Sequence, residues 1–298
     1  MSPEQGRIRI GISGWRYPGW RGVFYPPGLL QADELSYASR HFDTIEINGT
    51  HYSLQRPEFF GRWRDETPEG FVFAVKGSRF ITHMKQLRDI DAPLANFFAQ
   101  GLLRLGDKLG PFLWQFPPRF RFDRDKLERF VAMLPRDGDA ASVLASGHDR
   151  RLAGRSWAGC EAAGSLRHAI EIRHPSFLDP GFVALLRRYN VALVFADAVG
   201  WPYAEDVTAD FLYLRLHGSQ ELYASGYSAE ELDRWAARLL IWSTGGEPDD
   251  AKRIDPLARP QRRPRDVYVY FDNDAKIRAP FDAQTLRRKL GRSGHPRP

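Results

Sequence analysis

Two glutamates in this sequence each lie between isoleucines in a short run with the alternation of a β-strand. Glu46 stands in "TIEIN" (44–48), and Glu171 stands in "AIEIR" (169–173). A carboxylate buried in a strand costs free energy unless a partner compensates its charge. Two such carboxylates can act as general acid and general base when their surroundings separate their pKa values. We therefore predict Glu46 and Glu171 as catalytic residues, with His217 or His83 as alternative proton carriers.

Polar residues also stand at or near the ends of further β-like runs, and we predict that they line the same site. The set comprises Asn48, Lys76, Gln115, Arg173, Arg215, His217 and either Asp272 or Asn273. The carboxyl ends of parallel strands meet at one face of a barrel, where the active sites of barrel enzymes lie. The alternation of the last run (266–273) puts Asp272 and Asn273 on opposite faces, and it leaves open which of them faces the site.

The charged members of this set are balanced, with Glu46, Glu171 and Asp272 against Lys76, Arg173 and Arg215. A site for a hard divalent cation favours a surplus of oxygen ligands and few neighbouring cations. A divalent metal held by scattered histidines and carboxylates stays open as an alternative, but it is not favoured, and the sequence identifies no cofactor. Arginine binds phosphate or carboxylate through paired hydrogen bonds, so an anionic substrate suits the set better.

Aromatic residues alternate with arginine and glycine after the first β-like run. This segment, residues 14–28, contains Trp15, Tyr17 and Trp20, which together with Tyr52 are predicted to stack on a ring of the substrate. Aromatic side chains interleaved with cations suit the bases and backbone of a single-stranded nucleic acid, and they suit the face of a sugar almost as well.

Eight β-like runs follow one another along the chain, and helix-like stretches lie between most of them. The runs are residues 7–13, 44–48, 71–76, 111–116, 168–173, 191–196, 211–218 and 266–273. Amphipathic helices are predicted at 92–109, 123–135, 179–190 and 228–243, and the last begins with a capping box of Ser228 and Glu231. Strands that alternate with helices favour parallel pairing, and eight units in 298 residues predict a (β/α)₈ barrel of the TIM type.

An open doubly wound sheet is the alternative fold. It would place a glycine-rich turn that opens directly into a helix after the first strand, and bulky aromatic residues stand there instead. We expect one barrel domain over residues 1–298 with a core of about 8–290. Irregular insertions are expected at about 136–167 and 244–265.

The composition is that of a globular protein, with 43% hydrophobic and 27% charged residues and a formal net charge of +6. The positive charge favours anionic partners only weakly, because many basic proteins simply have a basic surface. Cys160 is the single cysteine, so it forms neither an intramolecular disulfide nor a cysteine metal cluster. No signal sequence or apolar membrane-spanning run is visible, and we expect a soluble, cytoplasmic protein with no membrane partner.

A series of motifs in this sequence resembles the YecE-like family, domain of unknown function 72. In chain order the motifs are "GISGWRYPGWRGVFYP", "TIEINGTHYSL", "FVFAVKGSRFITH", "WQFPP", "EIRHPSF", "YLRLHG" and "YVYFDNDAK", and they extend over about residues 8–290. The resemblance implies a TIM-like barrel in a bacterial, cytosolic protein, but no established reaction. It adds Thr82 and His174 to the polar positions already named, and it marks His51 and Asp272 as departures from residues common in the family.

The barrel of this family is distantly similar to the endonuclease IV type, and this analogy prompts a nucleic-acid hypothesis. The histidine-rich metal set of those enzymes is not recognisable here. Our leading prediction is an enzyme that acts on a phosphate-bearing substrate, either a nucleotide or single-stranded nucleic acid, with phosphodiester hydrolysis as one reaction. A carbohydrate or sugar-phosphate isomerase, epimerase or lyase is the second hypothesis, and a non-enzymatic binding or scaffold protein is the third. The oligomeric state is left open.

Overall fold

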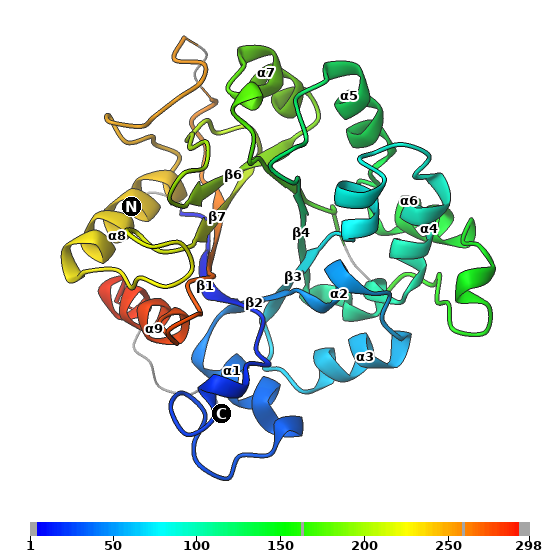
Figure 1. Cartoon of the computed structure of the whole chain (residues 1–298), viewed down its shortest axis with the longest axis horizontal. Coiled ribbons are helices and arrows are strands. Elements are labelled where there is room, and N and C mark those ends of the chain that lie inside the picture. The colour runs from blue at the N-terminus through cyan, green and yellow to red at the C-terminus, as the bar shows by residue number, and fades with distance from the viewer. Residues whose placement is uncertain (1–4, 162–163, 258–259, 292–298) are drawn as a thin grey trace.

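The computed structural model describes residues 5–161, 164–257 and 260–291, and it has the predicted barrel. Eight parallel strands close on themselves in chain order, so that β8 pairs with β1 (Figure 1). Their bounds are β1 Ile8–Ser13, β2 Thr44–Ile47, β3 Val72–Lys76, β4 Leu109–Gln115, β5 His168–Glu171, β6 Val191–Asp197, β7 Phe211–Leu216 and β8 Asp266–Phe271. Every run predicted as a strand forms one, and the TIM-like fold is confirmed.

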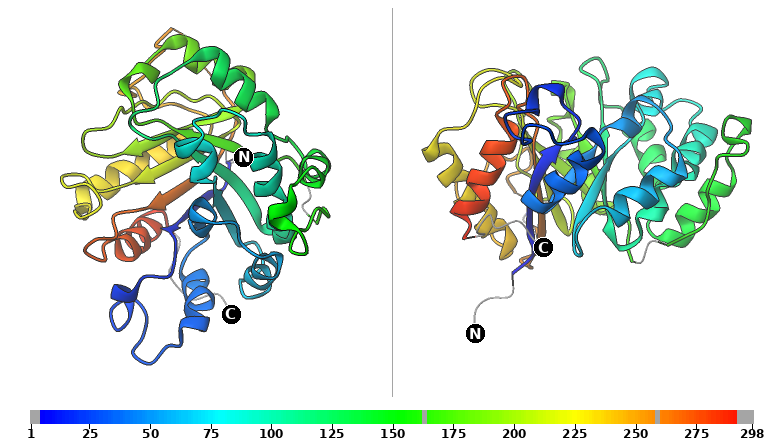
Figure 2. Two further views of the ribbon diagram at one scale, coloured as in Figure 1. Left: turned by 45° about the vertical axis from the view of Figure 1, so that its right-hand side comes forward. Right: turned by 90° about the horizontal axis from the view of Figure 1, so that it is seen from below.

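Helices surround the strands on the outside of the barrel (Figure 1 and Figure 2). Their bounds are α1 Glu34–His41, α2 Gly49–Tyr52, α3 Pro57–Asp65, α4 Asp91–Ala99, α5 Arg124–Met133, α6 Gly138–Ser146, α7 Pro180–Arg188, α8 Ala229–Ser243 and α9 Ala279–Lys289. The capping box of Ser228 and Glu231 is present at the start of α8. Within the described part of the chain, no helix has both the length and the apolar character needed to cross a membrane.

Two of the expected elements differ from the structure. The helix predicted at 92–109 is divided into α4 and a short 3-10 segment, Leu102–Lys108, because Gly101 adopts a left-handed backbone with φ of 102° that an α-helix does not accommodate. The stretch 136–167 was expected to be irregular, but it contains α6 at residues 138–146. Asp137 caps α6 by accepting a hydrogen bond from the backbone N–H of Ala140, at 2.8 Å.

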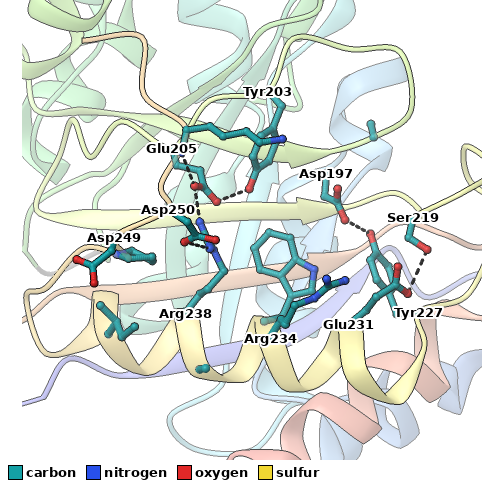
Figure 3. Close-up of a pocket in the computed structure, with 16 residues that line it drawn as sticks. Asp197, Tyr203, Glu205, Ser219, Tyr227, Glu231, Arg234, Arg238, Asp249 and Asp250 are labelled. Carbon is teal, nitrogen blue, oxygen red and sulfur yellow. Dashed lines mark hydrogen bonds and ion pairs between the residues drawn. The ribbon is translucent and has the colours of Figure 1, made fainter. Parts of the chain in front are cut away.

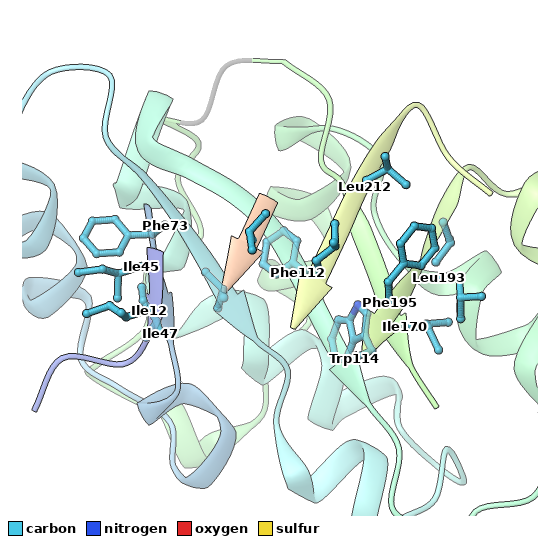
Figure 4. Close-up of a cluster of buried hydrophobic side chains, with 14 of the residues drawn as sticks. Ile12, Ile45, Ile47, Phe73, Phe112, Trp114, Ile170, Leu193, Phe195 and Leu212 are labelled. Atoms are coloured by element: carbon cyan, nitrogen blue, oxygen red, sulfur yellow. The ribbon is translucent and has the colours of Figure 1, made fainter. Parts of the chain in front are cut away.

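The apolar residues form two layers because successive side chains of a strand point to opposite faces. One layer packs between the strands and the helices and includes Ile12, Ile45, Phe73 and Trp114 (Figure 4). The other fills the barrel and contains small residues such as Ala74 together with tyrosines such as Tyr213. The barrel interior is therefore a packed core, and only its two ends are open to polar groups.

The wall between β6 and β7 is built differently from the rest of the barrel. Residues 198–210, which connect the two strands, contain neither a helix nor a strand. The buried side chains of Glu205 and Asp206 instead accept hydrogen bonds from backbone N–H groups of the segment that follows α8. The distances are 2.9 Å from Lys252, 2.7 Å from Ile254 and 3.0 Å from Asp255. This distant segment lies beside the connection where a unit helix is absent.

Candidate active site

A layer of polar side chains closes the barrel interior at the carboxyl ends of the strands. The side chain of each member points into the barrel. In several strands the member stands two residues after the last inward-facing apolar residue or tyrosine. The members of this polar layer are Ser13, Glu46, Lys76, Gln115, Glu171, Arg215 and Asp272. The sequence predicted all of them except Ser13, with Asp272 given as one of two choices.

Arg215 lies at the centre of the polar layer and is completely buried. Its Nη1 donates to Glu171 at 2.7 Å, and its Nη2 lies 2.9 Å from both Glu46 and Asp272. Burial alone would lower the pKa of Arg215, but the three carboxylates outweigh it and raise that pKa well above its usual value. Arg215 was predicted to bind an anionic substrate, and in the structure its charge is taken up by carboxylates of the protein.

The two predicted catalytic glutamates are held by fixed hydrogen-bond donors. Glu46 accepts from Ser13 at 2.5 Å, from Tyr213 at 2.6 Å and from Arg215. Glu171 accepts from Arg173 at 2.9 Å as well as from Arg215. Burial favours a raised pKa for Glu171, but Arg215 and Arg173 outweigh it and lower the pKa. For Glu171 these contacts favour the ionised carboxylate. The proposed acid–base role of the two glutamates stays a prediction.

The structure resolves the choice between the two residues at the end of β8. Asp272 points into the barrel and contacts Arg215, while His217 Nδ1 lies 3.2 Å from its Oδ2. Asn273 points away, and its Nδ2 donates to Asp282 at 2.7 Å and to the carbonyl of Ser225 at 3.0 Å. Asp272 therefore belongs to the polar layer, and Asn273 joins the start of α9 to the loop after β7.

Lys76 differs from the other charged members of the polar layer. Its side chain is 8% exposed, and within the described residues its Nζ forms no hydrogen bond or ion pair. Burial and the nearby charge of Arg215 lower the pKa of Lys76 to about 8, although Glu46, Asp272 and Glu171 act in the opposite direction. This amine therefore loses its proton far more readily than an ordinary lysine.

His83 lies on a short π-helical segment after β3, residues Phe80–Met84, with cations on several sides. Its Nδ1 lies 2.8 Å from the hydroxyl of Thr82, and its backbone carbonyl accepts from Arg119 at 3.1 Å. Burial lowers the pKa of His83 to about 4, and Arg173, Lys76, Arg79 and Arg119 lower it further. We call His83 and these four residues the cationic side of the mouth.

Two aromatic residues cover His217 at the mouth. The ring of Trp201 lies 4.9 Å from the imidazole, and the ring of Tyr223 lies 5.3 Å from it. Arg173 stacks on Trp201 with its guanidinium carbon 3.7 Å from the ring centroid. His217 is fully buried, and neither ring nitrogen has a hydrogen-bond partner in the structure, despite the short distance to Asp272.

The candidate set from the sequence contained neither Trp201 nor Tyr223, although both stand on loops after strands. Tyr213 and Ser13, which bind Glu46, were also absent from it. Ser13 could have been found from its place at the end of the first run, two residues beyond Gly11 in the inward phase. Tyr213 carried no polar signal because a tyrosine between leucines is an ordinary strand residue.

Three of the predicted stacking residues are packed into the protein. Trp15 is 7% exposed and meets Trp63 edge to face at 5.2 Å. Trp20 is 1% exposed, and its indole N–H donates to Asp274. Tyr17 is half-buried, stacks on Trp20 and donates its hydroxyl to the carbonyl of Ser13 at 2.5 Å. Gly14 turns the chain outward after β1 with φ of 86°, so this segment builds core beside the mouth.

The remaining predicted residues lie around the mouth with different surroundings. Tyr52 is 68% exposed and faces the guanidinium of Arg79. Asn48 donates to Ser13 at 3.2 Å, and Gln115 is buried beside Glu171 in the polar layer. His174 does not bond to the polar layer through its Nδ1, which accepts a hydrogen bond from the backbone N–H of Ser176 at 3.1 Å. Their roles in binding stay predictions.

Comparison with known proteins places this geometry in a family. A family model described as "Protein of unknown function DUF72" matches residues 9–298. The chain belongs to the DUF72 family. It is 28% identical to the UPF0759 protein YecE of Escherichia coli over 175 residues, which are 58% of this chain and 51% of YecE. It is also 28% identical to the UPF0759 protein YunF of Bacillus subtilis over 199 residues, 65% of this chain and 58% of YunF.

The chain thus spans about half the length of the curated relatives that it matches. A crystal structure of a DUF72 family protein from Thermotoga maritima superposes with a TM-score of 0.70 at 25% identity. The match covers 96% of this chain and 99% of that chain. The resemblance noted in the motifs is confirmed, and the family itself is defined without a reaction.

The described residues of this DUF72 protein offer no ready-made metal centre. Within them, no group of three or more histidine, cysteine, aspartate or glutamate side chains is arranged to hold a metal ion. In the polar layer, carboxylate oxygens that could bind a cation already accept from Arg215, Arg173, Ser13 and Tyr213. A cofactor is not identified by these contacts.

A cavity of about 790 Å³ lies outside the barrel along α8, away from the polar layer (Figure 3). Its volume would suit a small ligand. However, several of its polar side chains already pair within the protein: Arg238 donates to Asp250 at 2.6 Å and to Glu205 at 2.5 Å, and Tyr227 donates to Asp197 at 2.9 Å. Since the mouth combines buried charges, a lysine with a lowered pKa and a histidine with a lowered pKa, we place the candidate site there and not in this cavity.

Proposed function

We propose that this DUF72 protein is an enzyme that binds a small phosphate-bearing substrate at the barrel mouth. The phosphate would lie on the cationic side, and the rest of the molecule would extend over the polar layer toward His217. A nucleotide and a sugar phosphate both fit this description.

The proposal rests on a difference between the charged groups at the mouth: the carboxylates have cationic partners, but some of the cations have no carboxylate partner. The carboxylates of the polar layer are already bound by Arg215, and Glu171 is bound by Arg173 as well. Lys76 has no carboxylate partner, and its positive charge adds to those of Arg79, Arg119 and Arg173 around His83. Within the described residues Lys76, Arg79 and Arg119 form no ion pair with a carboxylate, whereas Arg173 is paired with Glu171. Such converging cations attract an anion, and arginine forks match phosphate oxygens.

The proton transfers of the reaction would be made by the groups that are free to change protonation. His83 is neutral at physiological pH, because its pKa is about 4. A neutral imidazole can accept a proton from the substrate, and phosphate bound beside it would make that easier by offsetting the surrounding cations. Glu46, Glu171 and Asp272 would keep Arg215 in place and set the field below the substrate.

The burial of the polar layer favours a small molecule over a nucleic-acid strand. Arg215, Glu171 and His217 have no exposed surface, and Trp201 and Tyr223 lie over His217. A strand lying across the rim would reach Tyr52, Arg79 and Arg119 but not these groups. Binding of single-stranded nucleic acid through its phosphates should weaken steeply as salt is raised, and this test separates the strand from the small substrate.

Replacing Arg173 with glutamine should remove most of the stabilisation that a phosphate compound gives to the protein. A ligand at about 100 times its Kd stabilises a protein by about 2.7 kcal/mol. Loss of a hydrogen bond to a charged group costs roughly 1.5–3 kcal/mol, so binding should weaken by about ten- to a hundredfold. Thermal unfolding with adenosine monophosphate, glucose phosphate and inorganic phosphate measures this change.

The matched control is Arg129→Gln, on the exposed face of α5. It should leave every ligand shift within error of the wild type. The proposal is wrong if no phosphate compound stabilises the wild type, or if Arg129→Gln loses as much stabilisation as Arg173→Gln. Stabilisation by inorganic phosphate alone would locate the anion site without naming the rest of the substrate.

Binding of a phosphate compound should be accompanied by proton uptake at His83. The anion offsets the charges of Arg173, Lys76, Arg79 and Arg119, which now lower the pKa of His83, so this pKa should rise from about 4 toward its ordinary value. Calorimetry at pH 6 in two buffers with different ionisation enthalpies measures the protons taken up. His83→Gln should abolish the uptake while His148→Gln, outside the mouth, should not change it. An uptake that persists in His83→Gln would assign the proton elsewhere.

A further inference from the structure

The chain contains few lysines, and Lys76 differs from the others in its contacts. Each of the others has a carboxylate, carbonyl or aromatic partner in the structure, namely Lys85, Lys108, Lys126, Lys252, Lys276 and Lys289. Within the described residues, Lys76 has none of these partners, although it is buried at the end of β3. A long, flexible cationic side chain without a partner in such a place has no structural benefit that explains it.

The neighbours of Lys76 explain why its amine stays unpaired. Glu46, Glu171 and Asp272 are close enough to raise the pKa of Lys76. However, each of these carboxylates already forms an ion pair with Arg215. His51 and His83 are also near enough for the charge of Lys76 to lower their pKa values, which are about 3 and about 4, and their rings lie 5.1 Å apart. The groups that act on the amine are therefore neutral imidazoles, the Arg215 cation and carboxylates that already have partners.

Simple phosphate binding would be served better by another residue. Arginine keeps its charge at any physiological pH and binds phosphate with two parallel hydrogen bonds, whereas a buried lysine loses its proton readily. The chain places arginine at neighbouring positions of the mouth, in Arg79, Arg119 and Arg173. A lysine at residue 76 is thus suited to chemistry that needs a neutral primary amine.

We propose that Lys76 is the nucleophile of this site and forms an imine with a phosphate-bearing aldehyde or ketone. This inference rests on the proposed function, and it narrows the substrate from any phosphate compound to a phosphorylated carbonyl compound. The phosphate would be held by the arginines of the cationic side while the carbonyl carbon meets the Nζ of Lys76.

The step balances without any further reactant. The lone pair of Nζ forms a bond to the carbonyl carbon, and the π pair of the carbonyl bond moves to its oxygen. A proton passes from the nitrogen to that oxygen, which gives a carbinolamine. A second proton, supplied by solvent water, then lets the oxygen leave as water, and the nitrogen lone pair forms the carbon–nitrogen double bond of the protonated imine. The protonated imine withdraws electrons from the adjacent carbon, so that a neutral histidine such as His83 can take a proton from that carbon.

Pyridoxal phosphate is a probe that combines an aldehyde with a phosphate. The protein should form an imine with it at pH 8, visible by its absorbance, and borohydride should reduce this imine to a stable amine. Peptide mapping should then find the modification at Lys76, formed about tenfold faster than at the exposed Lys276, because far more of the Lys76 amine is neutral. Pyridoxal, which lacks the phosphate, should react at Lys76 about tenfold more slowly than pyridoxal phosphate.

Two variants separate the amine from the charge. Lys76→Met and Lys76→Arg should both lose the imine absorbance, while Lys76→Arg should keep the thermal stabilisation by pyridoxal phosphate; Lys276→Met should behave as the wild type. Labelling that is spread evenly over surface lysines, or absent from Lys76, overturns the inference. Thermal stabilisation without an imine also overturns it but leaves the proposed function standing. Equal rates with pyridoxal and pyridoxal phosphate at Lys76 would support the nucleophile and overturn the phosphate site.

Discussion

Replacing Arg215 with methionine is expected to destabilise the protein by roughly 3–5 kcal/mol. The substitution keeps much of the side-chain volume but removes the cation that Glu46, Glu171 and Asp272 share. Glu46 and Glu171 have no exposed surface, so water cannot replace the lost partner without rearrangement of the barrel end. Urea unfolding at pH 7 measures the loss.

The cause of this loss can be tested by removing the stranded charges. Adding Glu46→Gln and Glu171→Gln to Arg215→Met should recover part of the lost stability, because a buried amide costs less than a buried carboxylate without a partner. Arg188→Met is the matched control: its exposed pair with Glu128 at 2.7 Å should contribute no more than about 1 kcal/mol. If Arg215→Met costs as little as Arg188→Met, the network does not hold the barrel end together.

Replacing Lys76 with methionine is expected to stabilise the protein by about 3 kcal/mol at pH 7. The pKa of Lys76 falls from 10.5 to about 8 in the folded protein, chiefly through burial, and each pKa unit corresponds to about 1.4 kcal/mol. The folded state therefore binds the proton less tightly than the unfolded state, which makes the charged lysine a cost to folding. Methionine of similar length removes this cost.

The pH dependence of this gain has a definite sign. The cost of Lys76 is fully present below pH 8, where the lysine is charged in both states. Between about pH 8 and 10.5 the folded state loses its proton first, so the wild type gains stability with rising pH and the advantage of Lys76→Met shrinks to about 1 kcal/mol by pH 10. Arg215, Glu46, Asp272 and Glu171 are the charged groups that act on this amine.

Urea unfolding of wild type and Lys76→Met from pH 7 to pH 10 checks both the size and the slope. Lys126→Met on α5 is the control, and its effect should stay within about 0.5 kcal/mol at every pH because its amine is partly exposed. A destabilising Lys76→Met, or a gain that does not change with pH, would contradict the lowered pKa. A stabilising substitution at a functional position is the expected trade between activity and stability.

Much of the barrel and of its polar layer could be predicted because the sequence of each strand has a recognisable pattern. The runs around Glu46 and Glu171 are short, apolar and β-branched, so both the strands and the unusual position of the carboxylates were visible. Since parallel strands of a barrel end at one face, a polar set at strand ends implied a common site. That inference predicts that Lys76, Arg215 and one of Asp272 and Asn273 lie together.

The partners within the site could not be predicted, because they depend on which side chains meet across the barrel. Arg215 was expected to hold substrate, and only the geometry shows that it is surrounded by three carboxylates from other strands. The phase of β8 was ambiguous because Tyr268 and Tyr270 fill the barrel, where aliphatic residues would be more usual. Trp15 and Trp20 were misplaced because an aromatic loop segment has the same composition whether it is a binding surface or a core.

The connection between β6 and β7 makes the closure of the barrel a long-range event. Glu205 and Asp206 bind backbone groups that lie 47 to 49 residues further along the chain, beyond β7 and α8. Each of the other connections between consecutive strands contains a helix, and several of these helices pack on the next strand, as α7 does on β6 and α8 on β8. Most of the wall can therefore form from neighbouring segments. Between β6 and β7 the wall can be completed only after α8 and the segment that follows it have folded. Contacts between such distant parts of the chain require closure of a long loop, which slows folding. Assembly of this barrel is therefore cooperative from β6 to β8 and does not proceed one unit at a time.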